Sequence, residues 1–184
     1  SGKCRHVGVC NYNARQVEKA ISELQKHGIK LASNQVELSI INQDKLHDGT
    51  VACCRDLGVV VLARSPLTGG LASGKYTLVD PAGHGQGGGL MAPSFSRRVL
   101  RKWFPLHRTL EKIARGVSRR MQRRVTTTQV SLNWVVAKGV VPIPEVRNKI
   151  EAEEILGCLG WELNPLEVDE LDEIYSRVKH KFWW

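Results

Sequence analysis

The apolar positions of the chain fall into four short runs, each followed by a polar or proline-containing corner and then by a stretch with helical spacing. The runs cover residues 6–11, 31–36, 59–63 and 139–144. Strands that alternate with helices predict an α/β fold with a parallel sheet, which binds ligands at the C-terminal ends of its strands. A closed barrel of such units needs eight of them and about 250 residues. The four units found here fall short of that number.

Apolar residues at helical spacing predict the helices between and after these strands. The predicted helices cover residues 14–27, 44–57, 127–138, 149–158 and 164–178. Thr126 or Thr127 is a suitable cap for the third, and Asn164 followed by Pro165 for the last. The whole chain, residues 1–184, is therefore expected to form a single domain.

A segment rich in glycine and proline interrupts this pattern. Residues 66–106 contain four prolines and the glycine-rich stretch at 83–89. Such a composition predicts a long loop without helix, with an insertion at residues 78–106. The segment lacks the Gly-x-x-x-x-Gly-Lys-Ser/Thr order of a phosphate-binding loop.

The net charge of +9 is concentrated in one part of the chain. Between Ser94 and Arg124 there are 11 basic residues and one acid, Glu111, whereas the remainder carries a net charge of −1. Leu110, Ile113 and Val117 form an apolar stripe here, which predicts a basic amphipathic helix over residues 107–124. This helix could be an ordinary barrel helix with a solvated face, or it could meet a protein, a membrane surface or, less favoured, RNA.

Cysteine and histidine usage indicates no metal or redox site. The five cysteines lack metal-site spacing, and the adjacent Cys53 and Cys54 are interpreted as small buried residues in a reducing compartment. The six histidines are expected on the surface or in loops. No apolar run approaches the roughly 20 residues that cross a bilayer. The first residue is Ser, so a removed targeting segment would not be visible.

The residues that follow the strands resemble those of a known family, the aldo-keto reductases. The similarity lies in residues 8–12, 32–37, 63–67 with 74–76, 128–134 and 141–148. Members of this family are (β/α)8 barrels that use NADPH. The order and spacing of the segments correspond to the second half of the barrel. The resemblance therefore implies a TIM-barrel fold of which this chain has about four C-terminal units and a C-terminal helix.

The same resemblance implies a dinucleotide across the strand ends. Asn11 and Gln35 match positions that bind the nicotinamide carboxamide, for which an amide offers both donor and acceptor. The residues that match pyrophosphate-binding positions are Ser65, Leu67, Gly69 and Lys75. Arg147 matches a position often basic for the 2′-phosphate, and Glu154 one associated with the adenine. These eight residues are the predicted cofactor site, with NADPH as the implied cofactor.

Four departures from the family pattern weaken this prediction. Cys10 replaces a serine, and Ile155 replaces an asparagine that would pair with adenine. Arg64 stands where an aromatic residue stacks on the nicotinamide, and Glu145 adds a carboxylate near the expected 2′-phosphate. Each change removes a donor or adds repulsion, at about 1–3 kcal/mol apiece.

Two interpretations of function follow. The family's catalytic Asp, Tyr, Lys and His come from the first half of the barrel, which this chain does not contain, so no catalytic residue is assigned. The chain is either an NADPH-dependent carbonyl oxidoreductase, weakly active or inactive alone, or a non-catalytic accessory subunit of a larger complex, such as a thylakoid or other membrane-associated one. Its partner surfaces would be the open half barrel, the basic segment 97–124 and Phe182, Trp183 and Trp184. The resemblance to plant-type reductases implies the chloroplast, and otherwise the cytoplasm.

Overall fold

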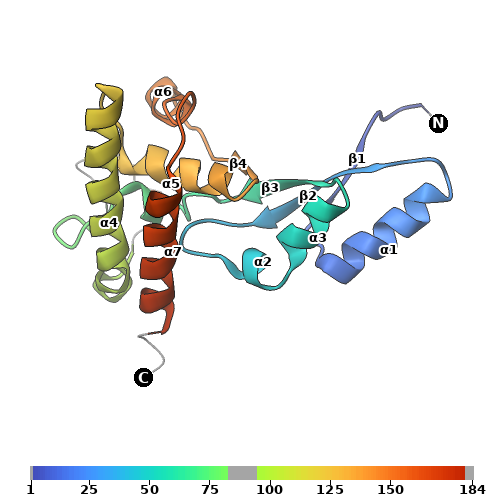
Figure 1. Ribbon diagram of the computed structural model, residues 1–184, viewed down its shortest axis with the longest axis horizontal. Coiled ribbons are helices and arrows are strands. Elements are labelled where there is room, and N and C mark those ends of the chain that lie inside the picture. The colour runs from blue at the N-terminus through green and yellow to red at the C-terminus, as the bar shows by residue number, and fades with distance from the viewer. Residues whose placement is uncertain (1, 83–94, 181–184) are drawn as a thin grey trace.

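The computed structural model describes residues 2–82 and 95–180. Within them four parallel strands form one sheet in the order β1-β2-β3-β4 (Figure 1). The strands are β1 (Val7–Cys10), β2 (Leu31–Glu37), β3 (Val60–Arg64) and β4 (Val141–Ile143). The strand–helix alternation and the parallel sheet expected from the sequence are therefore confirmed. Phe182, Trp183 and Trp184 lie outside the described residues.

The two faces of the sheet differ in burial. Val36, Val61 and Ala63 are almost completely buried, because helices cover their face. The alternate residues point to the other face, as the two-residue period of a strand requires. There Val60 is 48% exposed and Val141 49% exposed. Within the described residues this partly apolar face is left uncovered, as the resemblance to half of a (β/α)8 barrel implies.

Register places the residues of the open face in rows across the strands. Cys10 pairs with Gln35, Gln35 with Leu62, and Leu62 with Val141. The next row, nearer the C-terminal ends, joins Glu37 to Arg64 and Arg64 to Ile143. The polar residues of this face thus lie toward the ends of the strands.

The first helices follow the predicted positions with one correction. α1 (Ala14–Gln25) begins at Asn13, whose side chain accepts a hydrogen bond from the main-chain N–H of Gln16. The predicted helix over residues 44–57 is two helices, α2 (Asp44–His47) and α3 (Thr50–Asp56). Gly49 separates them because it has φ +81°, a left-handed conformation that glycine adopts at little cost.

The boundary between the glycine-rich loop and the basic helix was predicted wrongly. α4 spans Arg97–Met121, so residues 97–106 are helical and not part of a loop. Pro105 lies inside the helix without ending it. Leu100, Trp103 and Leu106 are buried, and Ser96 caps the helix through the N–H of Val99. Packing therefore outweighs the helix-breaking tendency of one proline. The centre of the predicted insertion lies outside the described residues.

The remaining helices are α5 (Thr127–Ala137), α6 (Lys149–Leu156) and α7 (Pro165–His180). The predicted caps are confirmed, with Thr126 accepting from Gln129 N and Asn164 from Glu167 N. α4 and α7 run side by side at one end of the molecule (Figure 1). The rings of Trp103 and Tyr175 stack between them at 6.1 Å.

Within the described residues, no helix is both long enough and apolar enough to cross a membrane.

Candidate functional site

A cavity of about 810 Å³ opens where β3 and β4 end. Its size falls within the usual range for small-ligand sites. It lies between the loop after β3 and the beginning of α6. Six of the eight predicted site residues line it, and these are Ser65, Leu67, Gly69, Lys75, Arg147 and Glu154.

The loop after β3 forms a tight turn with unused donors. Ser65 and Thr68 have φ of +53° and +50°, and the N–H of Thr68 donates to the Ser65 carbonyl at 2.9 Å. The hydroxyls of Ser39 and Thr68 lie 2.7 Å apart and fix the turn to the end of β2. Among the described residues, the N–H groups of Leu67 and Gly69 have no acceptor. Unpaired main-chain N–H groups in such a turn suit an anion.

Lys75 follows this turn at a position that α5 holds in place. The hydroxyl of Thr127 donates to the Ser73 carbonyl at 2.5 Å. A Cβ on Gly74 would approach that hydroxyl to 2.8 Å, and Gly74 has φ +74°, so a larger residue would be strained there. Lys75 and Glu151 both line the cavity, and the Lys75 ammonium contributes to lowering the pKa of Glu151.

On the far wall of the cavity, Arg147 lies just before α6 and is held by Glu151, in the first turn of that helix. Its guanidinium lies 2.7 Å from the carboxylate of Glu151. The hydrogen bond between them is the main cause that lowers the pKa of Glu151 and raises that of Arg147. Glu145 raises the pKa of Arg147 further. The charge of Arg147 is therefore largely balanced within the chain.

The lining as a whole carries no excess of either charge. Arg64, Lys75 and Arg147 face Glu145, Glu151 and Glu154 around the cavity. Ile155 also lines it, so the position that lacks the family's asparagine does belong to this site. Glu154 is fixed through its main chain, because its carbonyl accepts from Gln129 Nε2 at 2.9 Å.

Asn11 and Gln35 do not line this cavity, contrary to what a single continuous site would require. They adjoin each other on neighbouring strands, where Asn11 N donates to the Gln35 carbonyl at 2.7 Å. The Cys10 thiol lies 3.9 Å from the Gln35 side-chain oxygen. The structure therefore places the eight predicted residues in two groups along the C-terminal edge of the sheet.

Asn34 is a polar residue that the sequence analysis did not single out. It is fully buried, and its side chain binds both main-chain groups of Tyr12, donating to O at 2.9 Å and accepting from N at 3.3 Å. Asn34 thereby holds the segment after β1, including Asn11, against β2. The sequence signal that could have identified it is a polar residue at an alternating strand position where the other residues are apolar.

Arg64 is not an isolated cation on the open face. Its guanidinium lies 3.2 Å from the carboxylate of its cross-strand neighbour, Glu37. Both side chains are about half exposed, so this ion pair contributes little to stability. The carboxylate of Glu37 nevertheless offsets the positive charge of Arg64, which stands at the position where the family has an aromatic residue.

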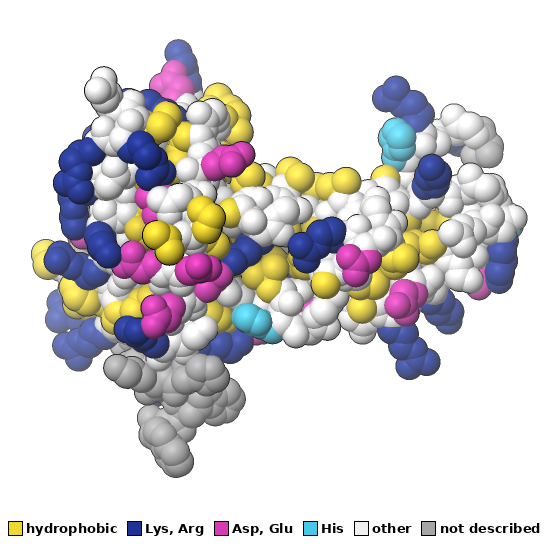
Figure 2. Space-filling model, in the orientation of Figure 1, with side chains coloured by type: hydrophobic (Ala, Val, Ile, Leu, Met, Phe, Trp, Pro, Cys, Tyr) yellow, Lys and Arg dark blue, Asp and Glu magenta, His cyan; other side chains and the backbone are white. Residues whose placement is uncertain are grey.

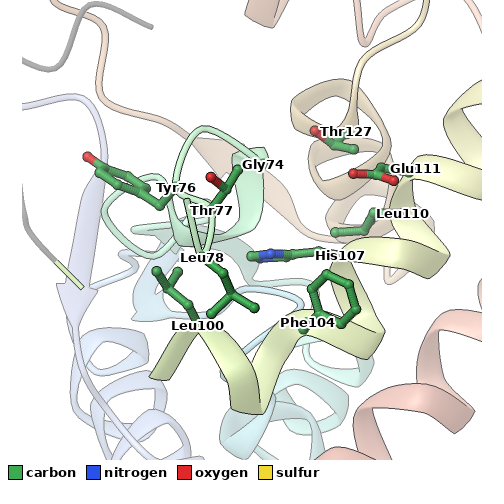
Figure 3. Close-up of a pocket in the computed structure, with 10 residues that line it drawn as sticks. All are labelled: Gly74, Tyr76, Thr77, Leu78, Leu100, Phe104, His107, Leu110, Glu111 and Thr127. Atoms are coloured by element: carbon green, nitrogen blue, oxygen red, sulfur yellow. The ribbon is translucent and has the colours of Figure 1, made fainter. Parts of the chain in front are cut away.

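A second, smaller cavity of about 60 Å³ lies between α4 and residues 74–78. Figure 3 shows the His107 imidazole pointing from α4 toward that segment, while the Tyr76 hydroxyl points away. His107 is buried, which corrects the expectation of a surface or loop histidine. Its Nε2 donates to the Leu71 carbonyl at 2.7 Å, and burial lowers its pKa. His107 thus makes a buried structural contact between α4 and the segment after β3.

The adjacent cysteines of α3 lie in or against the core, as expected for small apolar residues. Cys54 is buried in α3 and Cys53 partly so, and burial raises the pKa of both thiols. All five cysteines are free. The described residues contain no group of three or more metal-ligating side chains.

Comparisons with known proteins give one consistent result. The chloroplastic pyridoxal reductase of Arabidopsis thaliana is 33% identical over 172 residues, which are 93% of this chain and 44% of that protein. An uncharacterized oxidoreductase of Mycobacterium bovis is 33% identical over 174 residues, 94% of this chain and 50% of its own length. The chain therefore spans about half the length of these relatives.

A solved structure supports the same assignment. The crystal structure of the thermostable aldo-keto reductase Tm1743 with the inhibitor epalrestat superposes with a TM-score of 0.67 and 27% sequence identity. The match covers 92% of this chain and 48% of that one. The sheet and its helices are thus part of a (β/α)8 barrel. The model of the Aldo/keto reductase family matches residues 1–176, so this protein belongs to the aldo-keto reductases.

Proposed function

We propose that this chain is the cofactor-holding half of an NADPH-dependent carbonyl reductase. The supporting observation is the 810 Å³ cavity at the strand ends, which six predicted cofactor residues line. When bound, NADPH would supply the hydride for carbonyl reduction. The unused N–H groups of Leu67 and Gly69 and the ammonium of Lys75 fit the pyrophosphate, because together they offer two donors and one positive charge.

The other parts of the site fit the dinucleotide less well. Glu151 already occupies part of the Arg147 guanidinium, so a 2′-phosphate would share this cation with an internal carboxylate. Gln35 and Asn11 offer amides for the carboxamide, but the pair of Glu37 and Arg64 occupies the row above Gln35. We therefore expect weak cofactor binding by the chain alone.

Proton donation to the substrate is assigned to the half of the barrel that lies outside this sequence. General acid catalysis needs a donor within hydrogen-bond reach of the carbonyl oxygen. By resemblance to the family, that donor belongs to the first four units. In this proposal the described chain binds and orients the cofactor, while a complementary half barrel supplies the proton donor.

A second candidate is a non-catalytic accessory subunit, and the open sheet face supports it. Val60, Val141 and Ile143 are exposed on this face, and both edge strands have unpaired main-chain groups. Such a surface favours association with another polypeptide. The chloroplastic relative makes the plastid our proposed compartment for either function.

Co-expression with the N-terminal half of the Arabidopsis pyridoxal reductase separates the two candidates. A stable complex that oxidises NADPH in the presence of an aldehyde would support the reductase. A stable complex that binds no NADPH, even at millimolar concentration, would exclude it and favour the accessory role. A matched complex carrying Lys75→Ala should bind NADPH more weakly if the loop after β3 holds the pyrophosphate.

A further inference from the structure

The outer face of α4 carries a straight row of arginines. The row consists of Arg97, Arg101, Arg108, Arg115 and Arg119, all exposed. They follow one another at intervals of four and seven residues, so that on a helix with 3.6 residues per turn they fall within an arc of about 40°. With a rise of about 1.5 Å per residue, the row is about 33 Å long.

The acids of the neighbouring helix leave this arginine row largely unpaired. α7 neutralises other cations of α4, with Glu170 at 2.8 Å from Lys112 and Glu167 at 2.8 Å from Arg120. In contrast, Arg97, Arg101 and Arg119 form no hydrogen bond or ion pair with any residue that the structure describes. Figure 2 shows Lys and Arg side chains gathered over α4 at one end of the molecule.

Glu111 is the one acid of α4 and offsets only a small part of the positive charge of the arginine row. It lies 3.7 Å from Arg108 and 3.8 Å from Arg115, and both arginine side chains remain more than 60% exposed. Exposed pairs of this kind contribute little and are easily exchanged for other partners. The row is therefore available to a partner with many negative charges.

We propose that the arginine row binds the surface of a bilayer that contains anionic phospholipids. Guanidinium groups bind phosphates through two parallel hydrogen bonds, and clusters of four to eight basic residues on an amphipathic helix are typical of anionic lipid binding. A straight row on a convex helix can contact a flat surface along its whole length. Phe104, which is 48% exposed, lies beside Arg97, Arg101 and Arg108 and can enter the interfacial layer.

The same geometry fits other partners less well. A helix that lies in the DNA major groove directs the centre of its exposed face toward base edges and the two sides of that face toward phosphates. In α4 the arginines lie along the centre of the exposed face. Single-stranded RNA needs several aromatic residues for stacking, and Phe104 is the one exposed aromatic residue of α4. A stable protein interface needs an apolar core, and the exposed side of α4 offers only Phe104 and Pro105 among its charges.

Vesicle co-sedimentation of the full chain tests this proposal. We expect binding to phosphatidylcholine vesicles that contain about one third phosphatidylglycerol, little binding to pure phosphatidylcholine, and loss of binding in high salt. The triple variant Arg101→Glu, Arg108→Glu, Arg115→Glu should weaken binding at least tenfold, and Phe104→Ser several-fold. Because these side chains are exposed, circular dichroism should show unchanged folding.

A matched variant removes the effect of net charge. Arg15→Glu, Lys19→Glu, Lys30→Glu changes the charge equally at exposed positions on and after α1, at the other end of the molecule. It should leave most of the vesicle binding intact. Equal loss in both triple variants, no binding to anionic vesicles at low salt, or tighter binding to single-stranded RNA or polyglutamate than to the vesicles would overturn the proposal.

Discussion

The guanidinium of Arg147 and the carboxylate of Glu151 meet through two contacts, with Nη2 at 2.7 Å from Oε1 and Nε at 3.3 Å from Oε2. The main-chain N–H of Arg147 also donates to Oε2 at 2.9 Å. The carboxylate therefore occupies the Nε and Nη2 side of the guanidinium, with which Arg147 could otherwise bind a phosphate in bidentate fashion. Any anion that enters this side of the cavity competes with Glu151.

Removal of that carboxylate should strengthen anion binding. We expect Glu151→Ala to lower the Kd for NADPH several-fold, because Arg147 loses its internal partner. Glu153→Ala is the matched control, since Glu153 lies on α6, is well exposed and forms a loose pair with Lys149 at 3.7 Å. Fluorescence titration measures both. An unchanged Kd for Glu151→Ala would mean that Arg147 does not contact the cofactor.

The Arg147–Glu151 pair should also give a small acid dependence. The pKa of Glu151 is lowered in the folded chain, so the pair stabilises the fold above the ordinary glutamate pKa, and this contribution is lost as the pH falls through the lowered value. Arg147 is 47% exposed, so solvent screening limits the contribution to about 1 kcal/mol or less. Urea unfolding of the wild type and Glu151→Ala between pH 3 and pH 6 should show the two curves converging toward the acid end.

An aromatic residue at position 64 should improve cofactor binding. Arg64→Tyr removes a positive charge that opposes an oxidised nicotinamide and provides a ring that can stack on it. The loss of the exposed pair with Glu37 should cost little stability. We expect a several-fold lower Kd for NADP⁺ by titration. Arg55→Tyr on α3 introduces the same ring away from the cavity, and an equal gain there would refute a specific effect.

Asn133 should be among the most sensitive polar positions of the chain. Its buried amide donates to the carbonyls of Cys158 and Trp161 at 3.2 and 2.8 Å and accepts from Leu163 N at 2.8 Å. Asn133→Ala leaves these three main-chain groups without a partner, which should lower the free energy of unfolding by about 2–4 kcal/mol. Asn13→Ala, which removes only the cap of α1, should cost about 1 kcal/mol. Urea unfolding distinguishes the two values.

Burial of His107 should make the fold sensitive to mild acid. Because burial lowers its pKa, the unfolded chain binds the proton more tightly than the folded one. The stabilising contribution is therefore complete above the ordinary histidine pKa and declines as the pH falls from there to the lowered value. His107→Gln can still donate to the Leu71 carbonyl. It should reduce the pH dependence of the urea midpoint between these two pKa values. The exposed His27→Gln should not, and a flat wild-type profile would contradict the prediction.

Particular elements show why some features could be predicted and others could not. The four strands were identifiable because each apolar run is short and ends at a polar corner, and the cap at Thr126 because its pattern is local. The start of α4 at Arg97 was missed because its first turns depend on burial of Leu100 and Trp103, which composition does not reveal. The burial of His107 was missed for the same reason, since it requires the Leu71 carbonyl from a distant loop.

The unit of the fold, a strand followed by a helix, could be identified from the sequence, as could the residue types at each strand end. These features depend on local periodicity and turn chemistry, so they can be predicted without knowing which elements pack together. Which strand-end residues share a cavity, and which do not, depends on the tertiary structure. It also decided that the cations Arg64 and Arg147 are matched by Glu37 and Glu151, whereas the arginine row of α4 is left facing outward. Electrostatic contacts depend on distances of a few ångström between charged groups, and only the folded chain sets most of those distances.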